Sequence, residues 1–408
     1  MAKEKAVLAY SGGLDTSVCI KWLQDEYDLD VVAVVGEVGQ EHDGLEAVRQ
    51  RALDTGAIEA RVIDMRDEYA DKILTNALAA NSLYENKYPL LSALSRPIIT
   101  KYLVDVAHEV GATTIAHGCT GKGNDQVRFE TCIKVLDPSL KILAPVRQWD
   151  LKTREQEMDW AREHGVEVPT TKDSPYSIDD NMWGRAIECG VLEDPWNEPP
   201  TDIYTMTISP EEAPDEPRYV EIEFKQGVPV AIDGKKVTMR QAVETMNEIA
   251  GNLGYGRLDI IEDRLVGMKS RECYECPGSM SLITAHKALE NLCLERDTLK
   301  IKLNLEQEWA TQVYDGRWFS PVKSAIDAFI ANTQTCVTGT VRLKFLKGNC
   351  TAVGLKSDFS LYNYSLATYG DEDRFDQKLS KGFIDLYSLQ LTTWSENRHK
   401  CGLSELGE

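Results

Sequence analysis

The first 165 residues alternate short apolar runs with amphipathic segments. Five runs have the length and β-branched content of buried strands, and they span Ala6–Tyr10, Val31–Val35, Ala60–Ile63, Thr113–Ala116 and Lys141–Ala144. Between the second and third runs, a helical repeat over Gly44–Thr55 places Leu45, Val48, Ala52 and Leu53 on one face. This alternation predicts an α/β domain with a parallel sheet and helices on both of its faces.

The pattern changes after a turn-rich passage from Pro169 to Pro217, which holds eight prolines. Beyond it the pattern is α+β. Apolar and polar residues alternate, as in strands, around Val220, Ile222 and Phe224 and again around Val341, Leu343 and Phe345. Helical periodicity is present over Met239–Leu253 and Ser279–Asp297. Near the end, Phe383, Tyr387, Leu391 and Trp394 recur at the spacing of one helix face. We therefore expect three parts: 1–165, 166–360 and an arm over 361–408.

Composition narrows the class of protein. The chain has 408 residues, 42% of them hydrophobic, and a net charge of −21 from 66 acidic and 45 basic residues. This balance argues against nucleic acid as a partner, because binding a phosphate backbone needs a cationic face. No stretch has the roughly 18 apolar residues of a membrane helix, and the N-terminal residues lack the apolar region of a secretory signal. We expect a cytoplasmic protein without a membrane partner.

The ten cysteines follow no regular framework, which fits free thiols in a reducing compartment. The spacing Cys273-Tyr-Glu-Cys276 is the only pair of its kind. Half of a zinc or iron–sulfur site can have this spacing, but a second pair is missing from the sequence. We therefore expect no metal site and no prosthetic group.

One segment carries a strong chemical signal. Residues 9–17 read Ala-Tyr-Ser-Gly-Gly-Leu-Asp-Thr-Ser, where the first predicted strand runs into a helix that starts near Asp15. The two glycines let the backbone pass close to a ligand. The hydroxyls of Ser11, Thr16 and Ser17 stand beside the free N–H groups of a helix start, which attract anions. The segment predicts a phosphate-rich ligand, although it matches neither the Walker nor the dinucleotide pattern.

A second loop follows the fourth predicted strand. Residues 117–130 read His-Gly-Cys-Thr-Gly-Lys-Gly-Asn-Asp-Gln-Val-Arg-Phe-Glu. Three glycines again suit close contact with a ligand, and Asp125 and Arg128 offer a carboxylate and a guanidinium. That mixture suits a zwitterionic amino acid beside a nucleotide. Because Tyr10-Ser11-Gly12, Gly36 and His117-Gly118 all lie at strand ends, we expect them to line one crevice.

The two loops together resemble those of the argininosuccinate synthases, members of the N-type ATP pyrophosphatase superfamily. Further matches are Tyr-Pro-Leu-Leu-Ser-Ala-Leu-Ser-Arg-Pro at 88–97 and Gly-Met-Lys-Ser-Arg at 267–271. The resemblance implies that MgATP activates citrulline as citrullyl-AMP with release of pyrophosphate. Aspartate then displaces AMP to give argininosuccinate, in arginine biosynthesis. It also implies a homotetramer with C-terminal helical arms.

The same resemblance assigns ligands to residues. The ATP contacts would be Ala9, Tyr10, Ser11, Gly12, Gly13, Leu14, Asp15, Thr16, Ser17, Gly36 and Gly118. The aspartate contacts would be Thr120, Asn124 and Asp125. The citrulline contacts would be Tyr88, Asn124, Arg128, Ser177, Ala186, Glu262 and Tyr274. Many family members have a hydroxyl where this chain has Ala93 and Ala186. Ser92 or Ser95 could replace the first hydroxyl, or the backbone could make that contact. The missing hydroxyl at Ala186 would remove a hydrogen bond worth about 0.5–1.5 kcal/mol.

Some questions stay open at this level. Asp125 could accept the proton of the attacking amine or serve only in an ion pair, so no residue is assigned as a catalytic base. Related enzymes of the superfamily are alternatives, among them tRNA thiolases, GMP synthetases and asparagine synthetases. A thiolase is disfavoured by the acidic charge, and an amidotransferase by the lack of an N-terminal cysteine nucleophile. A sensor that binds ATP without cleaving it is the alternative from a different class.

Overall fold

The computed structural model describes residues 3–40, 44–167 and 175–403. The chain forms two compact units, Met1–Phe359 and Ser360–Glu408. Within the described ranges, no helix is both long enough and apolar enough to cross a membrane. Pro169, at the start of the predicted turn-rich passage, lies outside the described residues.

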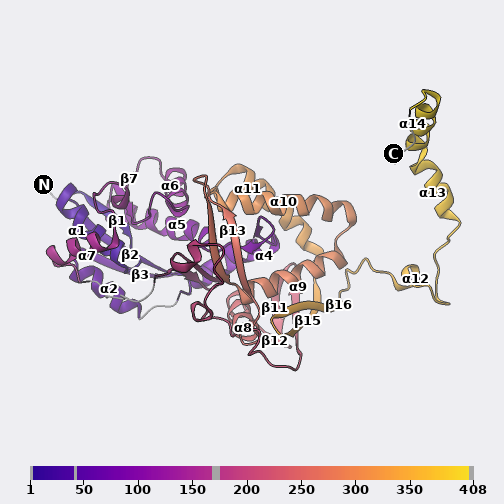
Figure 1. Ribbon diagram of the computed structural model, residues 1–408, viewed down its shortest axis with the longest axis horizontal. Coiled ribbons are helices and arrows are strands. Elements are labelled where there is room, and N and C mark those ends of the chain that lie inside the picture. Colours follow the sequence, from indigo (N-terminus) through magenta and orange to yellow (C-terminus); the bar gives the residue numbers. More distant parts are fainter. Residues whose placement is uncertain (1–2, 41–43, 168–174, 404–408) are drawn as a thin grey trace. The chain divides into compact units, whose positions relative to one another are not determined.

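The first unit begins with the predicted parallel sheet, whose strand order is β3-β2-β1-β6-β7 (Figure 1). Its strands are β1 (Lys5–Ala9), β2 (Asp30–Glu37), β3 (Glu59–Asp64), β6 (Thr114–His117) and β7 (Lys141–Leu143). Each matches one of the five predicted runs within a few residues. In register, Ala9 pairs with Val34 of β2 and with His117 of β6. The loops that follow β1 and β6 therefore start side by side.

Helices cover both faces of this sheet, as the alternation predicted. They are α1 (Leu14–Tyr27), α2 (Leu45–Asp54), α5 (Ser92–Val110), α6 (Asp125–Leu136) and α7 (Arg154–Glu163). Successive residues of β1 point to opposite faces. Leu8 therefore packs with α1, α2 and α7 in one apolar cluster, and Val7 packs with α5 and α6 in another.

Short elements connect β3 to α5. They are α3 (Arg66–Glu68), a π-helical stretch (Tyr69–Leu74), α4 (Thr75–Ala79), and the paired strands β4 (Leu83–Tyr84) and β5 (Tyr88–Pro89). A 3₁₀ turn over Pro145–Arg147 follows β7.

Two antiparallel sheets build the rest of the unit. One has the order β12-β11-β10-β15-β16 and consists of β10 (Arg218–Lys225), β11 (Val228–Ile232), β12 (Lys235–Lys236), β15 (Gly339–Leu346) and β16 (Asn349–Lys356). The other has the order β13-β14-β9-β8 and consists of β8 (Ser177–Asn181), β9 (Gly184–Glu188), β13 (Arg257–Asp263) and β14 (Lys269–Glu275). The β8–β9 hairpin lies inside the passage that the prolines had marked only as turns.

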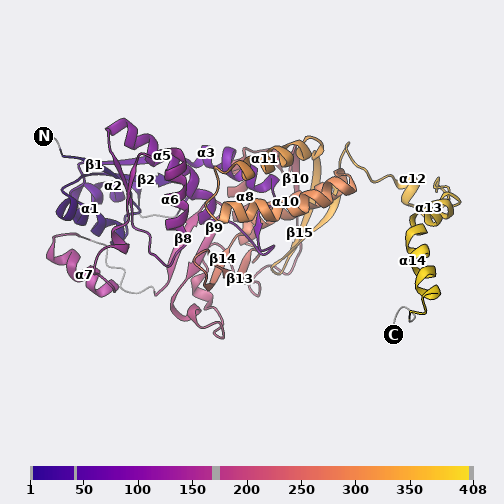
Figure 2. The ribbon, with the colours of Figure 1, turned by 90° about the horizontal axis from the view of Figure 1, so that it is seen from above.

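Four longer helices accompany these sheets: α8 (Met239–Gly251), α9 (Pro277–Cys293), α10 (Arg296–Tyr314) and α11 (Pro321–Thr333). Figure 2 shows α10 and α11, in orange, side by side. Short 3₁₀ turns lie at Gly190–Glu193, Thr201–Ile203 and Gln334–Cys336. The single helix predicted over Ser279–Asp297 is wrong at its end. Helix α9 stops at Cys293, because Glu295 caps α10 by accepting from the N–H groups of Asp297 and Thr298.

A buried polar cluster ties the segment after α4 to α9 and α10. Lys302 Nζ lies 2.9 Å from Glu290 Oε1 and also pairs with Glu306, and all three side chains are 0–2% exposed. Asn81 Nδ2 donates to both carboxylates, at 2.6 and 2.7 Å. A buried cation held by two carboxylates is stable only while every partner is present.

The described part of the second unit, up to residue 403, contains three helices: α12 (Tyr364–Ala367), α13 (Leu379–Tyr387) and α14 (Leu389–Lys400). The predicted stripe Phe383, Tyr387, Leu391 and Trp394 is therefore divided between two helices, with Ser388 between them. All four of its side chains are exposed.

Candidate active site

The first glycine-rich loop leads from β1 into α1. Gly12 has φ +82°, a left-handed conformation that favours glycine, and an added Cβ would lie 2.7 Å from Val48 Cγ1. Gly13 is the N-cap of α1 and offers no side-chain acceptor to the first N–H groups. The hydroxyls of Ser11 and Thr16 lie 3.1 Å apart and bracket the turn. The helix start therefore presents N–H groups and hydroxyls that suit an anion.

Side chains from neighbouring helices support this loop. Arg51 of α2 donates from Nη1 to the carbonyl of Gly12 at 2.7 Å. On the other side, Glu157 of α7 is 9% exposed. Burial, together with a hydrogen bond to Asp15, raises the pKa of Glu157 to about 8. Near neutral pH Glu157 is therefore largely protonated and donates its hydrogen bond to Asp15.

The second loop lies directly beside the first. A Cβ added at Gly118, just after β6, would lie 3.0 Å from Thr16 Cγ2. Glycine at this position lets the two loops approach closely. The two loops therefore meet at the carboxyl edge of the sheet. Of the six residues expected to line one crevice, Ser11 and Gly118 belong to the cavity lining described next, whereas Tyr10, Gly12, Gly36 and His117 do not.

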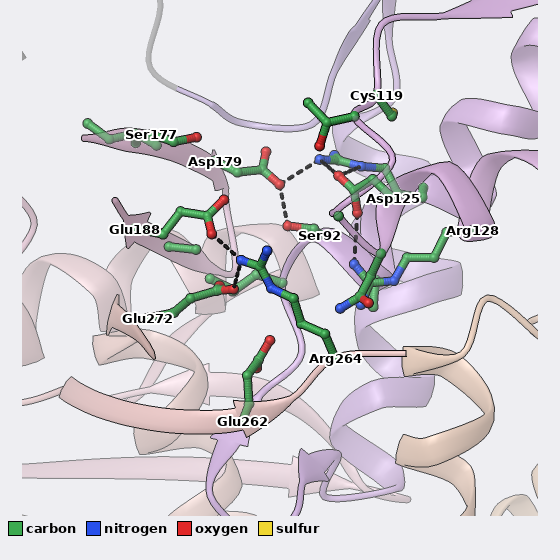
Figure 3. A pocket seen from close by; sticks show the side chains of 18 of the residues that line it. Ser92, Cys119, Asp125, Arg128, Ser177, Asp179, Glu188, Glu262, Arg264 and Glu272 are labelled. Atoms are coloured by element: carbon green, nitrogen blue, oxygen red, sulfur yellow. Dashed lines mark hydrogen bonds and ion pairs between the residues drawn. The ribbon is translucent and has the colours of Figure 1, made fainter. Parts of the chain in front are cut away.

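A cavity of about 390 Å³ opens between these loops and the β8–β9 and β13–β14 hairpins (Figure 3). Its lining comprises Ser11, Tyr88, Leu91, Ser92, Ala93, Arg96, Gly118, Cys119, Thr120, Gly123, Asn124, Asp125, Arg128, Ser177, Ile178, Asp179, Ala186, Glu188, Glu262, Arg264, Glu272 and Tyr274. Six of these are carboxylates or tyrosines from the β4–β5, β8–β9 and β13–β14 hairpins, and three are arginines. The cavity therefore suits a polar, zwitterionic ligand.

Asp125 is held between two guanidinium groups, as Figure 3 shows. Arg96 donates to its Oδ2 from Nε at 2.9 Å and from Nη2 at 2.6 Å, and Arg128 Nη1 donates to its Oδ1 at 2.8 Å. Burial alone would raise the pKa of Asp125, but the two arginines outweigh it and lower the pKa to about 2. Asp125 is therefore a carboxylate at neutral pH and a good acceptor for an ammonium group.

Arg128 is itself fixed by its surroundings. Its Nε donates to the carbonyl of Tyr314 at 2.9 Å, and its guanidinium lies 4.9 Å from the centre of the Tyr314 ring. Burial alone would lower its pKa, but the charge of Asp125 raises it. The guanidinium therefore lines the cavity as a cation that is held in one orientation.

Glu262 lies at the floor of the cavity among tyrosines. It accepts from the hydroxyls of Tyr274 at 3.1 Å and Tyr314 at 2.9 Å, and it is 2% exposed. Burial, followed by repulsion from Glu272, raises the pKa of Glu262 to about 7. Tyr88 stacks on Tyr274 with their ring centres 4.2 Å apart. Tyrosines thus form one wall next to an acid that titrates near neutrality.

The tip of the β13–β14 hairpin touches the second loop. Arg264 pairs with Glu188 and, at 3.1 Å, with Glu272. The N–H of Leu265 donates to Asn124 Oδ1 at 2.9 Å, and Asn124 Nδ2 donates to the Tyr314 hydroxyl at 2.8 Å. The hairpin and the loop are therefore joined through side chains that line the cavity.

The expected ligand residues fall into three groups. The cavity brings together Ser11, Gly118, Thr120, Asn124, Asp125, Tyr88, Arg128, Ser177, Ala186, Glu262 and Tyr274. In the remainder of segment 9–17, Ala9 ends β1, and the other residues form the adjoining turn and the first turn of α1. Gly36 lies in β2, where a Cβ would come within 3.2 Å of Met65 and Ile99, and it is not part of the described cavity lining.

The alanine positions have polar neighbours. Ala186 pairs across the hairpin with Asp179, whose Oδ2 accepts from the Ser92 hydroxyl and from Arg96. Ser92 lines the cavity, whereas the Ser95 hydroxyl is occupied by the carbonyl of Ser92 and by Arg96. Of the two serines suggested as a replacement for a hydroxyl at residue 93, only Ser92 reaches the cavity.

Several lining residues were not singled out from the sequence: Arg96, Asp179, Glu188, Arg264 and Glu272. Arg96 lies within segment 88–97, and the resemblance of that segment to the family is the signal that could have indicated it. The others lie in hairpins whose pairing the sequence did not predict.

Across the described residues, no group of three or more His, Cys, Asp or Glu side chains could hold a metal ion. Cys273 and Cys276 are free and fully buried.

Comparison with known proteins covers almost the whole chain. The family model of the arginosuccinate synthase N-terminal HUP domain matches residues 5–167, and that of the arginosuccinate synthase C-terminal domain matches residues 176–394. The argininosuccinate synthase of Streptococcus gordonii is 54% identical over 389 residues, which is 95% of this chain and 96% of that one. That of Chlorobium luteolum is 52% identical over 396 residues, which is 97% of this chain and 99% of that one.

Among solved structures, the U34-tRNA thiolase NcsA from Methanococcus maripaludis shows a weak likeness. It is 18% identical, has a TM-score of 0.27, and covers 43% of this chain and 60% of its own. This similarity is too low to inform fold or function.

Proposed function

Because the chain belongs to the argininosuccinate synthase family, and is therefore a carbon–nitrogen ligase that uses ATP to join citrulline and aspartate in arginine biosynthesis, we propose that it works through a citrullyl-AMP intermediate. The products of the two steps would be pyrophosphate, AMP and argininosuccinate. The observation that carries the proposal is the cavity itself, where a phosphate-type loop and an amino-acid-type loop meet.

In the first step the ureido oxygen of citrulline attacks the α-phosphorus of ATP. Segment 9–17 would hold the leaving pyrophosphate through the N–H groups at the start of α1 and the hydroxyls of Ser11 and Thr16. The ureido oxygen is nucleophilic without a strong base, so positioning supplies most of the rate. ATP enters as its magnesium complex. Asp15 offers one carboxylate, and Mg²⁺ is usually held by one or two carboxylates together with substrate phosphates.

The citrulline would lie along the tyrosine wall. We place its carboxylate on Arg128, whose guanidinium is fixed by Tyr314, with Tyr88, Tyr274 and Glu262 along the remaining chain. Asn124, Ser177 and the backbone near Ala186 complete the proposed contacts. Ala186 has no hydroxyl with which to contact citrulline. The loss of that hydrogen bond would weaken citrulline binding rather than change the reaction.

Aspartate would bind beside it on the second loop, through Thr120, Asn124 and Asp125. Its amine then attacks the activated carbon and displaces AMP. The low pKa of Asp125 favours a role in holding the ammonium group rather than in removing its proton, because a carboxylate with a pKa of about 2 is a weak base. We therefore assign no catalytic base.

Pyrophosphate release measured with substrates added one at a time tests the proposal. Pyrophosphate should appear only when ATP, Mg²⁺ and citrulline are all present, and argininosuccinate only after aspartate is added. Turnover of similar rate with glutamine or a tRNA in place of citrulline would contradict it. Citrulline-independent ATP binding without pyrophosphate release would favour the nucleotide sensor instead.

Other features remain proposals that follow from the family. We propose a cytoplasmic homotetramer without a prosthetic group. Within each chain, residues 1–165 would bind ATP, 166–360 would bind the amino acids, and 361–408 would serve assembly. The exposed aromatic side chains of α13 and α14 support the last assignment, since large aromatics bury roughly 150–250 Å² each in an interface.

A further inference from the structure

A chain of hydrogen bonds supports segment 118–124 of the second loop. It consists of His117, Glu130, Arg147 and Gln126, none of which belongs to the cavity lining as described. The loop itself, residues 118–124, contains three glycines and is conformationally permissive. Ordering such a segment costs conformational entropy, so outside contacts must define its shape.

His117 holds the start of the loop. It ends β6, is 1% exposed, and accepts at Nδ1 from the N–H of Cys119 at 3.2 Å. Because Nδ1 accepts, the ring proton must be on Nε2, which lies 3.3 Å from Glu130 Oε1. The hydrogen bond from His117 lowers the pKa of Glu130, and the charge of Arg147 adds to this effect against burial. Glu130 is therefore an ionised acceptor, which fixes the histidine tautomer.

The other end of the loop is held through the same chain. Arg147 pairs with Glu130 and donates from Nη1 to Gln126 Oε1 at 2.8 Å. Since that contact occupies the amide oxygen, Gln126 Nε2 is turned toward the loop. It donates to the carbonyls of Gly121 at 2.7 Å and Gly123 at 3.1 Å. One connected network thus reaches backbone groups at both ends of the loop.

We propose that His117, as its Nε2–H tautomer, is a positioning residue that shapes loop 118–124 for the amino-acid nucleophile. The effect on substrate rests on the proposed function, in which this loop binds aspartate through Thr120 and Asn124. The effect on loop structure does not depend on that function. Glu130 and Arg147 pass the constraint to Gln126, so that loss of either end loosens the same segment.

Two substitutions of His117 in the full-length protein separate the role of Nδ1 from that of the ring. His117→Asn keeps an acceptor close to the Nδ1 position. His117→Phe keeps a ring that can stack on Phe129, as His117 does at 5.9 Å between centres, but has no acceptor. We expect His117→Phe to raise the aspartate KM about tenfold, on the scale of one lost hydrogen bond, and His117→Asn to stay within about threefold of wild type. The KM values for ATP and citrulline should change much less than that for aspartate.

Hydrogen exchange followed by mass spectrometry gives a readout that does not require activity. Peptides covering residues 117–124 should lose protection in His117→Phe and keep it in His117→Asn. His108→Phe, at an exposed histidine on α5, is the matched control and should change neither readout. Gln126→Leu removes the other anchor. It should give the same aspartate defect as His117→Phe, with a double variant showing less than the sum of the two effects.

The outcomes separate this inference from the proposed function. If wild type releases no citrulline-dependent pyrophosphate, the proposed function fails, and the exchange experiment still decides the role of His117. If His117→Phe keeps the wild-type aspartate KM and loop protection, the inference is wrong. Equal defects in His117→Asn and His117→Phe would also overturn it, because the Nδ1 acceptor would then not matter. If His117→Phe does not fold, Gln126→Leu decides: unchanged aspartate KM and exchange would overturn the inference.

Discussion

Glu262 should make the protein less stable as the pH rises from about 4.5 to about 7. Its carboxyl is 2% exposed, and burial with repulsion from Glu272 raises its pKa to about 7, against 4.5 ordinarily. The folded state therefore binds this proton more tightly than the unfolded chain does. Stability contributed by the protonated form is complete below about pH 4.5, falls as pH rises through the window to about 7, and is lost above it.

Glu262→Gln removes this pH dependence, because the amide is neutral throughout. The shift from 4.5 to about 7 corresponds to roughly 3 kcal/mol of destabilisation of wild type at pH 8. The amide nitrogen cannot accept from a tyrosine hydroxyl, so the variant loses one of the two bonds from Tyr274 and Tyr314. That loss costs about 0.5–1.5 kcal/mol at any pH. The net expectation is a variant about 2 kcal/mol more stable than wild type at pH 8.

Urea unfolding at pH 5 and pH 8, at equal protein concentration, measures the effect. The difference in unfolding free energy between Glu262→Gln and wild type should shift by about 2–3 kcal/mol in favour of the variant between the two pH values. Glu223→Gln, at an exposed carboxylate on β10, serves as the control and should show no such shift. A difference that is the same at both pH values would refute the reasoning, since it would mean that Glu262 is ionised at no cost in the folded protein.

Three further predictions concern other parts of the chain. Arg128→Lys should raise the citrulline KM far more than the ATP KM, because it removes a forked guanidinium contact worth about 1.5–3 kcal/mol; an unchanged citrulline KM would show that the carboxylate binds elsewhere. Lys302→Met leaves Glu290 and Glu306 buried without a cation and should lower the free energy of unfolding by about 3–5 kcal/mol in urea titrations, whereas a loss below about 1 kcal/mol would contradict it. Deleting residues 383–408 should convert the proposed tetramer into smaller species by light scattering, and a truncated chain that stays tetrameric would rule out an assembly role for the arm.

Local patterns were sufficient to predict the parallel-sheet part of the fold. All five strands of the parallel sheet and helix α2 lie within a few residues of their predicted positions, because hydrophobic periodicity reflects burial directly. The glycines of segments 9–17 and 117–130 marked both loops, since close backbone approach and positive φ at Gly12 need glycine. Strand order then places the two loops together at one edge.

Elements whose partners lie far away in sequence were harder to predict. The β8–β9 hairpin was missed because its turn-rich surroundings concealed a strand that pairs with β14, about 90 residues later. The end of the helix predicted over Ser279–Asp297 was misplaced because the capping role of Glu295 is a matter of geometry rather than of periodicity.

By itself, the sequence determined the α/β class, the two glycine-rich loops and the family resemblance, because these depend on local residue order and spacing. Only the tertiary structure decided how the charges of the site are arranged. Arg96 and Asp179 are separated by 83 positions, and each is an unremarkable surface-type residue until the fold joins them through a 2.6 Å contact. The protonation of Glu262 likewise depends on burial and on the proximity of Glu272. Desolvation and charge proximity are properties of three-dimensional packing, and a linear pattern does not encode them residue by residue.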